Sequence, residues 1–463
     1  MVHIKISKGL DIPIKGIPTG NPQSLILGGG SYPLLAPPLM ALDVKEFEDL
    51  RLKLLVKPGD AVKIGQPLAE DKGTPGRFFC SPAGGTIRDI RRGEKRVPLD
   101  IIIEVAKAEE SLTFSRIDIS RASREEIIEA LKAGGAFANI RSRPFSLLAN
   151  PDTMPRSIFV KAIESAPFAP PAELQVIGHE KEFQVGLQAL SKLTAGMVHL
   201  VYRQNTPLKA FSEAKYVQRH TAEGPHPIAN QSLHIEKIDP ILSAKDVIWT
   251  INAHDVVAIG YLLTTGRYYT DKIISIAGPG VLPEKTGYFK IRQGFPVEAL
   301  ISGRIPKGSM RFISGDPLTG HKVGAEDFLG YNDYVFSVIP ENVKREFLHF
   351  FGLGLDKYSF SKAYLSGHLN NTDREYDFTT NQHGEHRAFI DSTLYDKVMP
   401  LNVPTMPLVK AVLAEDFDLA ETLGLLEVDS EDFALPAFVC PSKMEMTSIM
   451  KNGLRQYAKE ILQ

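Results

Sequence analysis

The feature that most constrains the fold is an alternation of apolar strand-like runs with amphipathic helical runs between residues 120 and 263. The predicted strands are short and apolar: 157–160, 197–202 and 247–251. The predicted helices carry apolar residues three or four positions apart: 124–133, 180–193 and 253–263. Because parallel strands are joined through helices, this order predicts a doubly wound parallel sheet in a Rossmann-like α/β domain over residues 111–268.

Signals at both ends define the first of these helices. Ser123 and Glu126 have the spacing of a capping box, and Gly134-Gly135 ends the helix. Two cations, Arg141 and Arg143, follow closely. Ligands of doubly wound sheets gather near such loops, so these arginines could receive an anion or a polar headgroup; a solvated loop is the alternative.

The segment before this domain has an all-β character. Short apolar strands alternate with turns rich in Gly and Pro, which predicts a small β unit over 36–110. Two pieces of it, V-K-P-G-D-A-V-K-I-G-Q-P-L at 56–68 and S-P-A-G-G-T-I at 81–87, resemble the biotinyl/lipoyl-type barrel-sandwich domain. A carrier domain of that class would present one lysine, for which Lys72 is the candidate, although the loop after it does not match a tight carrier hairpin.

Three further segments complete the predicted organisation. Residues 1–35 form a Gly- and Pro-rich N-terminal segment, whose Gly28–Gly30 run lacks the helix that must follow a phosphate-binding loop. Residues 269–335 are predicted as strands around one short helix, which suits a β-grasp module of the soluble-ligand-binding type. Residues 336–463 are predicted to be mostly helical, with a dense run of acidic residues at 415–432.

The composition excludes several classes of protein. The 463 residues carry 53 basic and 55 acidic side chains, a formal charge of −2, and this balance argues against nucleic-acid binding. The two cysteines, Cys80 and Cys440, can neither staple a secreted scaffold of this size nor hold a four-thiolate iron–sulfur cluster or a structural zinc by themselves. A reducing cytosol is the expected compartment.

Neither a membrane-spanning helix nor a signal peptide is predicted. The most apolar stretch, 247–263, is interrupted by Asn252, His254 and Asp255. A span needs about 20 largely uncharged residues. A function at a membrane would therefore require a partner that holds this chain at the bilayer.

The sequence contains no complete catalytic or metal-binding set. It has no nucleophile elbow, Walker motif, C-x-x-C pair or Rossmann glycine fingerprint. His220, His226 and His234 are spaced too irregularly for a compact metal pattern, which favours loop-fixing roles. His383 and His386 flank a glutamate and could bind zinc, but the glycine between them weakens the helix that would aim them.

Several pieces of the chain occur in the order of a known family. They are I-S-K-G-L-D-I-P-I-K-G at 6–16, the barrel segment at 56–87, G-G-A-F-A-N-I-R-S-R-P-F-S at 134–146, G-P-H-P at 224–227, I-A-G-P-G at 276–280, F-I-S-G-D-P-L-T-G at 312–320 and F-V-C-P-S-K at 438–443. Spread over almost the whole chain, they resemble the NqrA family, one of the subunits of the Na+-translocating NADH:quinone reductases, and more distantly the RnfC-type and complex I flavoprotein subunits.

This resemblance implies a peripheral subunit on the cytoplasmic face of the bacterial inner membrane. The complex it implies has six subunits, oxidises NADH, reduces quinone and exports Na+. The resemblance further implies that this chain holds no tightly bound cofactor, that quinone is its ligand, and that NADH and the flavins bind to partner subunits. The expected partners are the integral-membrane and flavin-bearing subunits.

The resemblance also carries a hypothesis about the ligand site. The flavoprotein relatives bind FMN through a glycine-rich loop after a helix, where Phe137 and Arg141 here add bulk, and only Glu164 retains an acidic contact at the second position. A cradle remodelled in this way could take a quinone, which is a flat apolar ring with two acceptor oxygens. The predicted quinone-binding residues are Phe137, Arg141, Arg143, Phe145, Glu164 and Phe168, and no catalytic residue is predicted.

Several alternatives stay open. The phenylalanines of this set could simply pack the sheet. A lipoyl- or biotin-carrier fusion would carry an added group on Lys72, and a stand-alone flavin oxidoreductase would be yellow as purified. Cys440 belongs to a single C-P pair that cannot ligate a cluster unaided. The roles of His226 and Cys440 are left open.

Overall fold

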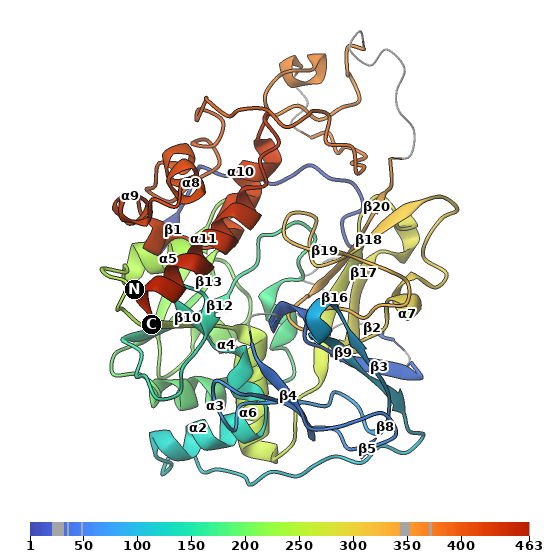
Figure 1. The fold of residues 1–463 in the computed structure, drawn as a ribbon, viewed down its shortest axis with the longest axis vertical. Helices are drawn as coiled ribbons and strands as arrows, with labels where there is room; N and C mark the ends of the chain where they lie inside the picture. The colour runs from blue at the N-terminus through green and yellow to red at the C-terminus, as the bar shows by residue number, and fades with distance from the viewer. Residues whose placement is uncertain (21–31, 35–36, 48–49, 343–351, 370–372, 463) are drawn as a thin grey trace.

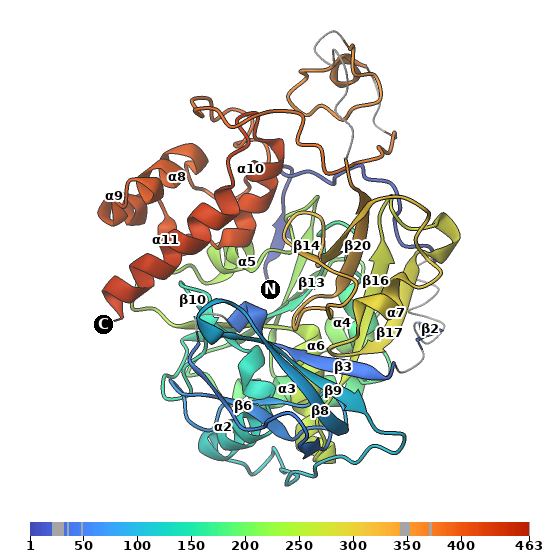
Figure 2. The same cartoon turned by 45° about the vertical axis from the view of Figure 1, so that its right-hand side comes forward.

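The computed structural model describes residues 1–20, 32–34, 37–47, 50–342, 352–369 and 373–462. The Gly28–Gly30 run lies outside these residues. In the part described, four β-sheets have seven, six, four and three strands, and helices lie on both sides of the largest sheet (Figures 1 and 2).

The largest sheet has the strand order β1-β14-β13-β12-β15-β10-β11. Its strands are β1 (His3–Lys5), β14 (Gln218–Glu223), β13 (Val198–Arg203), β12 (Ser157–Ala162), β15 (Ile248–Asn252), β10 (Arg141–Arg143) and β11 (Leu147–Leu148). The first five run parallel, whereas β10 pairs antiparallel with β15 and β11 pairs antiparallel with β10. The predicted parallel α/β sheet is therefore present, and the N-terminal strand β1 extends it by pairing with β14. Its Rossmann-like class stays a prediction.

Three helices cover one face of this sheet. They are α2 (Arg124–Ala133), α3 (Glu180–Ser191) and α6 (Ala253–Thr265). Because successive strand residues point to opposite faces, Ile158 and Val160 of β12 pack against this helical layer, while Phe159 packs on the other side. The capping box predicted at Ser123 and Glu126 is confirmed.

The layer is tight where α3 and α6 cross. A Cβ atom on Gly260 of α6 would collide with the carbonyl oxygen of Glu182 in α3. A Cβ atom on Gly186 of α3 would likewise collide with the carbonyl oxygen of Val256. The two glycines let the helix backbones approach each other directly, which fixes where α6 begins relative to the sheet.

The second face of the sheet is covered by α5 and by the C-terminal region (Figures 1 and 2). The elements are α5 (Gln231–Ile238), α8 (Thr405–Leu413), α9 (Phe417–Thr422), α10 (Ala434–Val439) and α11 (Met446–Ile461). One core cluster joins Phe159 and Val201 of the sheet to Phe433, Met450 and Leu454 of this region. These helices complete the core of the α/β sheet. The prediction that 336–463 is mostly helical holds from Thr405 onward and is wrong for the described residues between β20 (Val335–Pro340) and α8.

The predicted small β unit is built from two sheets that share a core. One sheet contains β3 (Leu39–Asp43), β9 (Pro98–Val105), β8 (Gly85–Arg92) and β5 (Ala61–Val62), and the other contains β4 (Leu52–Leu54), β6 (Pro67–Asp71) and β7 (Phe78–Cys80). Met40, Leu68, Phe79 and Ile103 are fully buried between them. Lys72 is exposed on the connection from β6 to β7.

The remaining sheet has the order β19-β18-β20-β16-β17-β2 and mixes parallel with antiparallel pairs. Its elements are β2 (Tyr32–Pro33), β16 (Asp271–Ala277), β17 (Gly287–Arg292), β18 (Met310–Ser314), β19 (His321–Val323), β20 (Val335–Pro340) and the short helix α7 (Val297–Ile301). Arg91 of β8 lies 2.6 Å from Asp100 and 2.9 Å from Asp327, so an ion network ties the β unit to this sheet. The β-grasp class stays a prediction.

The residues between β20 and α8 form an irregular segment. In its described part the one regular element is the 3-10 helix η7 (Leu365–His368). Tyr376 makes a bridge to Ile14 of the N-terminal segment, and His383 and His386 lie exposed on a loop. Across the residues that the structure describes, no helix is long and apolar enough to cross a bilayer.

Candidate functional site

The candidate site lies where the strand order of the large sheet reverses. Strands β13 and β14 follow β12 on one side, whereas β15 lies on the other side of β12. In open α/β sheets, ligands bind outside the carboxyl ends of the strands at such a reversal. Two adjoining pockets open here, at the ends of β12 and β15.

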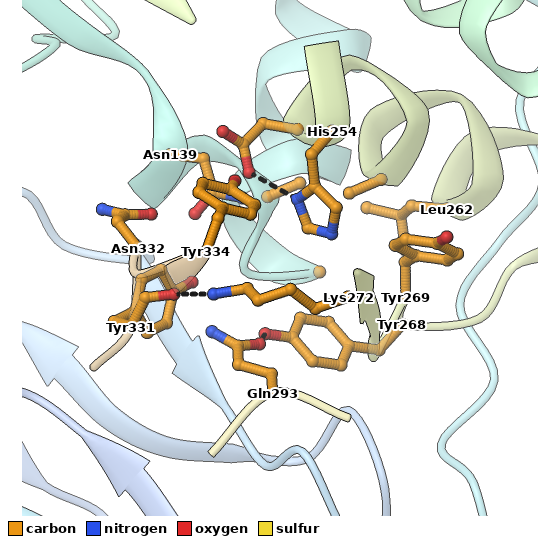
Figure 3. A pocket seen from close by; sticks show the side chains of 14 residues that line it. Asn139, His254, Leu262, Tyr268, Tyr269, Lys272, Gln293, Tyr331, Asn332 and Tyr334 are labelled. Atoms are coloured by element: carbon orange, nitrogen blue, oxygen red, sulfur yellow. Dashed lines mark hydrogen bonds and ion pairs between the residues drawn. The ribbon is translucent and has the colours of Figure 1, made fainter. Parts of the chain in front are cut away.

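The larger pocket encloses about 400 Å³ of empty space, part of it open to solvent. Its walls come from the start of α6, from the 3-10 helix η3 (Ala136–Asn139) after α2, and from the residues flanking β16 and β20. The polar and aromatic lining side chains, drawn in Figure 3, are Asn139, His254, Asp255, Tyr268, Tyr269, Lys272, Gln293, Tyr331, Asn332 and Tyr334. The site is therefore shared between the α/β sheet and the six-stranded sheet.

Lys272 is the central cation of the pocket, and it is 3% exposed. Its Nζ atom donates to the carbonyl oxygens of Tyr331 at 2.5 Å and Asp333 at 3.3 Å, and it lies 4.8 Å from the ring centroid of Tyr334. Burial lowers the pKa of Lys272. Two backbone carbonyls and an aromatic face thus already engage this ammonium group.

The tyrosines supply flat walls and hydroxyl groups. Tyr268 donates to Oε1 of Gln293 at 2.8 Å. Burial raises the pKa of Tyr268, Tyr269, Tyr331 and Tyr334, so their hydroxyls stay neutral at physiological pH. Neutral hydroxyls of this kind can donate hydrogen bonds to a ligand oxygen.

One polar atom of the lining is left without a partner. The Oδ1 atom of Asn139 is buried and accepts no hydrogen bond in the described part of the chain. A buried polar atom without a partner costs free energy unless something satisfies it. Because this oxygen can only accept, a ligand would satisfy it with an O–H or N–H group.

His254 stands between the two pockets and lines both. Its Nε2 atom lies 2.9 Å from the backbone oxygen of Asp271, and its Nδ1 atom lies 3.2 Å from Oδ1 of Asp255. The imidazole ring also contacts the rings of Tyr269 and Tyr334, with centroids 5.6 Å and 5.5 Å away. The start of α6 thus places a hydrogen-bonded imidazole–carboxylate pair at the pocket wall.

The smaller pocket extends from His254 toward the end of β12 and spans about 270 Å³ of empty space, part of it open to solvent. It is lined by the ion pair of Lys161 with Glu164, whose Nζ and Oε1 atoms are 3.0 Å apart. Glu431 of the C-terminal region lies near Lys161, and burial raises its pKa to about 8. A titratable group from the C-terminal region therefore lies behind this pocket.

The six residues predicted from the sequence are not gathered in one place. Glu164 lines the smaller pocket. Phe137 is fully buried, with its ring 5.6 Å from that of Trp249 and 5.5 Å from the Arg77 guanidinium. Arg141 pairs with Glu46 at 2.9 Å.

The other three predicted residues lie on the side of the C-terminal and N-terminal segments. Arg143 is 2% exposed and donates to Ser232 and to the Val428 carbonyl. Phe145 packs against Tyr457. Phe168 packs in a cluster with Ile14, Ala277 and Val335. Of the six, only Glu164 lines either pocket, and the phenylalanines pack in three separate clusters.

The glycine-rich loop after α2 is packed against protein. A Cβ atom on Gly134 would collide with the Leu262 side chain, and one on Gly135 would lie 2.8 Å from the Sγ atom of Cys80. Gly135 also has a positive φ of 72°. Both glycines are thus explained by packing and backbone conformation, and Gly134 also lines the larger pocket.

Sequence reasoning missed most of the pocket lining. In the sequence, His254 and Asp255 are notable only as interruptions of the most apolar stretch of the chain. A charged pair at the start of an otherwise apolar helix that follows a buried strand is the signal that could have found them. The tyrosines come from two separate segments, and only the fold brings them together.

Three family models match successive parts of the chain. The NqrA N-terminal barrel-sandwich hybrid domain matches residues 4–106. The NqrA second alpha/beta domain matches residues 122–268, and the NQRA C-terminal domain matches residues 273–325. The match over 4–106 agrees with the barrel-sandwich resemblance of the β unit.

Curated relatives match over nearly their whole length. A protein of Chlamydia caviae is 38% identical, covering 99% of this chain and 97% of the relative. A protein of Chlamydia pneumoniae is 37% identical over 99% and 98%, and one of Saccharophagus degradans is 35% identical over 99% and 100%. Each is named as the A subunit of the Na(+)-translocating NADH-quinone reductase.

Among solved structures, the NAD+-reducing [NiFe]-hydrogenase in the H2-reduced state gives a TM-score of 0.36 at 14% identity, over 76% of this chain and 67% of that chain. A likeness of this size carries no argument about fold or function. In contrast, the identities of 35–38% to the curated relatives, over 99% of the sequence, are sufficient to assign the family. This chain belongs to the NqrA family, the A subunits of the Na(+)-translocating NADH-quinone reductases.

Proposed function

We propose that this chain is the peripheral, cytoplasmic-face NqrA subunit of a membrane-bound Na+-translocating NADH-quinone reductase, and that its larger pocket binds the quinone ring. Its family membership supports the first part. The observation that carries the second part is the set of neutral tyrosines around Lys272, together with the side-chain amide of Asn139 in the same lining. In this proposal quinone is the ligand of the chain.

The electrostatics of the pocket favour a neutral ring over a phosphate-bearing cofactor. Phosphate needs backbone N–H groups or cations that are free to face it. Lys272 is held by two carbonyl groups, so its ammonium is not free to face a phosphate. The loop glycine Gly134 is packed against Leu262. A tightly bound flavin is therefore not part of the proposal, and NADH and the flavins are assigned to partner subunits.

A quinone ring complements this lining. It is flat and apolar on both faces, so aromatic side chains such as Tyr334 and Tyr268 can pack against it. Its two oxygens accept hydrogen bonds, which neutral hydroxyls and the amide of Asn139 can donate. The polar groups of the pocket would then fix the orientation of the ring.

The test is an equilibrium titration of the purified full chain with a water-soluble short-tail quinone. Asn139→Ala removes an amide whose oxygen has no partner in the described part of the chain, so the fold should be unaffected while the quinone Kd rises about tenfold. Tyr334→Leu removes one aromatic wall and should weaken binding similarly.

Arg141→Ala is the matched control, because Arg141 is predicted from the sequence but does not line the pocket. Its Kd should equal that of the wild type. If Arg141→Ala weakens binding while Asn139→Ala and Tyr334→Leu do not, the pocket is wrong and the residue set predicted from the sequence is favoured. If quinone does not bind the wild-type chain at all, the quinone-binding role is wrong.

A further inference from the structure

The pair of His254 and Asp255 has a feature that binding alone does not require: both imidazole nitrogens face acceptors. The backbone oxygen of Asp271 can only accept a hydrogen bond, so Nε2 of His254 carries a proton. Nδ1 faces a carboxylate oxygen of Asp255 at 3.2 Å. That second contact is a hydrogen bond whenever Nδ1 carries a proton as well.

A protonated imidazole in this position donates from both nitrogens, to Asp271 and to the carboxylate of Asp255. Histidine is the side chain that most often gives and takes protons near neutral pH. A proton on Nδ1 at the pocket wall could pass to a ligand that gains negative charge.

We infer that the His254–Asp255 pair is the proton donor to quinone in this pocket, an inference that rests on the proposed function. Quinone becomes quinol by taking two electrons and two protons. NADH supplies the electrons through the complex. As the ring is reduced, the Nδ1–H bond of His254 breaks and an O–H bond forms on the nearer quinone oxygen. The imidazole is then neutral and keeps its Nε2 proton hydrogen-bonded to the carbonyl oxygen of Asp271. Water supplies the second proton and later reprotonates the pair.

The other charged and titratable groups around His254 are already committed to partners. From β16, Lys272 is held by carbonyls, and the carboxylate of Asp271 pairs with Lys290 at 2.7 Å. From the end of β12, Lys161 pairs with Glu164.

The two aromatic rings against His254 cannot replace it as donor. Burial raises the pKa values of Tyr269 and Tyr334, so these hydroxyls release a proton with difficulty. His254 is only partly covered, with 12% of its side chain exposed, and it lines both pockets. The imidazole is therefore the group placed to deliver a proton to the ligand and recover one from solvent.

The experiment uses the complete reductase complex carrying His254→Gln or Asp255→Asn in this subunit. Quinone reduction by NADH is measured from mildly acidic to mildly alkaline pH, and quinone affinity is measured on the same variants. We expect His254→Gln to lower kcat about a hundredfold, with little change in KM, and to abolish one limb of the pH profile. Asp255→Asn should also lower kcat, because it removes the partner that stabilises the protonated imidazole.

His179→Gln is the matched control. His179 also contacts Tyr269, with ring centroids 5.2 Å apart, but it does not line the pocket. Its kcat and pH profile should be those of the wild type. The rate at which NADH reduces a soluble dye should be unchanged in all variants, because that electron transfer takes place before quinone is reduced.

Two different failures can be told apart. If His254→Gln and Asp255→Asn bind quinone and keep the wild-type kcat and pH profile, the proton-donor inference is overturned and the binding function stands. If the wild-type subunit binds no quinone, the proposed function itself fails. If His254→Gln loses quinone binding together with activity, Asp255→Asn decides the matter, and normal turnover in that variant also overturns the inference.

Discussion

The guanidinium of Arg143 donates a 2.7 Å hydrogen bond to the backbone oxygen of Val428, although the two residues are 285 positions apart. Arg143 belongs to β10, at one end of the large sheet, and Val428 belongs to the C-terminal region. A second hydrogen bond joins Arg143 to Ser232 of α5 at 2.8 Å. This buried arginine therefore holds together the sheet, α5 and the C-terminal helices.

Replacement of Arg143 by Met should destabilise the protein by about 2–4 kcal/mol, because it removes charge-assisted hydrogen bonds and takes a cation away from the buried carboxyl group of Asp432. Chemical denaturation followed by circular dichroism measures this loss. Arg141→Met is the control. Arg141 is 33% exposed and pairs with Glu46, so its loss should cost less than about 1 kcal/mol. Equal losses of unfolding free energy in the two variants would contradict the conclusion that Arg143 joins these parts of the fold.

Three buried histidines should make the protein acid-labile. Burial lowers the pKa of His220, His226 and His234 from the ordinary 6.5 to about 4. Between these values the unfolded chain binds more protons than the folded chain. The contribution of these neutral histidines to the free energy of unfolding is therefore complete above pH 6.5. It decreases as the pH falls toward 4, by up to about 1.4 kcal/mol per pH unit for each histidine.

Urea titrations between pH 4 and 6.5 measure how the free energy of unfolding depends on pH. His226→Gln should flatten this dependence, because His226 is buried and its Nδ1 atom contacts Ser165 at 3.0 Å. The exposed residue His368 provides the comparison, and His368→Gln should leave the slope unchanged. A wild-type stability that does not vary with pH across this interval would show that these imidazoles are not buried in neutral form.

The crossing of α3 and α6 should not tolerate a methyl group. In Gly260→Ala the new Cβ would collide with the Glu182 carbonyl, so the helices must separate, and we expect a loss of about 1–3 kcal/mol in unfolding free energy. Gly73→Ala on the β6–β7 connection is the matched control, because its Cβ would meet only Asp71, with Oδ1 at 3.3 Å. The same substitution there should have little effect on the unfolding midpoint.

Both cysteines should be inert in the folded protein. Cys80 and Cys440 are 1% and 0% exposed, and burial raises the pKa of the Cys80 thiol. The Sγ atom of Cys440 lies 3.1 Å from the hydroxyl of Tyr395, which accounts for Cys440 as a packed and hydrogen-bonded side chain. A thiol-reactive dye should label neither residue in buffer and both in denaturant. Rapid labelling of Cys440 in buffer would indicate an accessible thiol.

Local signals in the sequence are sufficient to predict local structure. The alternation at 157–263 predicts β12, β13, β15, α3 and α6, and the capping box at Ser123 marks the start of α2. These features depend on residues a few positions apart, and periodicity and capping act over that distance.

The long-range pairings leave no such signal. The joining of β1 to β14, of β2 to β17, and of the C-terminal helices to the second face of the sheet depends on residues far apart in the sequence. The site shows the same limit. The loop carrying Phe137 does contribute to the candidate site, since Asn139 lines the pocket, but the turn of η3 directs Phe137 itself toward Trp249.

The cluster that includes Ile4, Phe159 and Tyr457 has a consequence for biosynthesis. While the ribosome is still translating residues 405–461, the strands of the α/β sheet have already been synthesised, but one of their two faces still lacks the C-terminal helices that pack beside α5. A nascent chain of this protein therefore displays an uncovered apolar surface until translation is nearly complete, and this makes it a natural client for chaperones that bind emerging polypeptides.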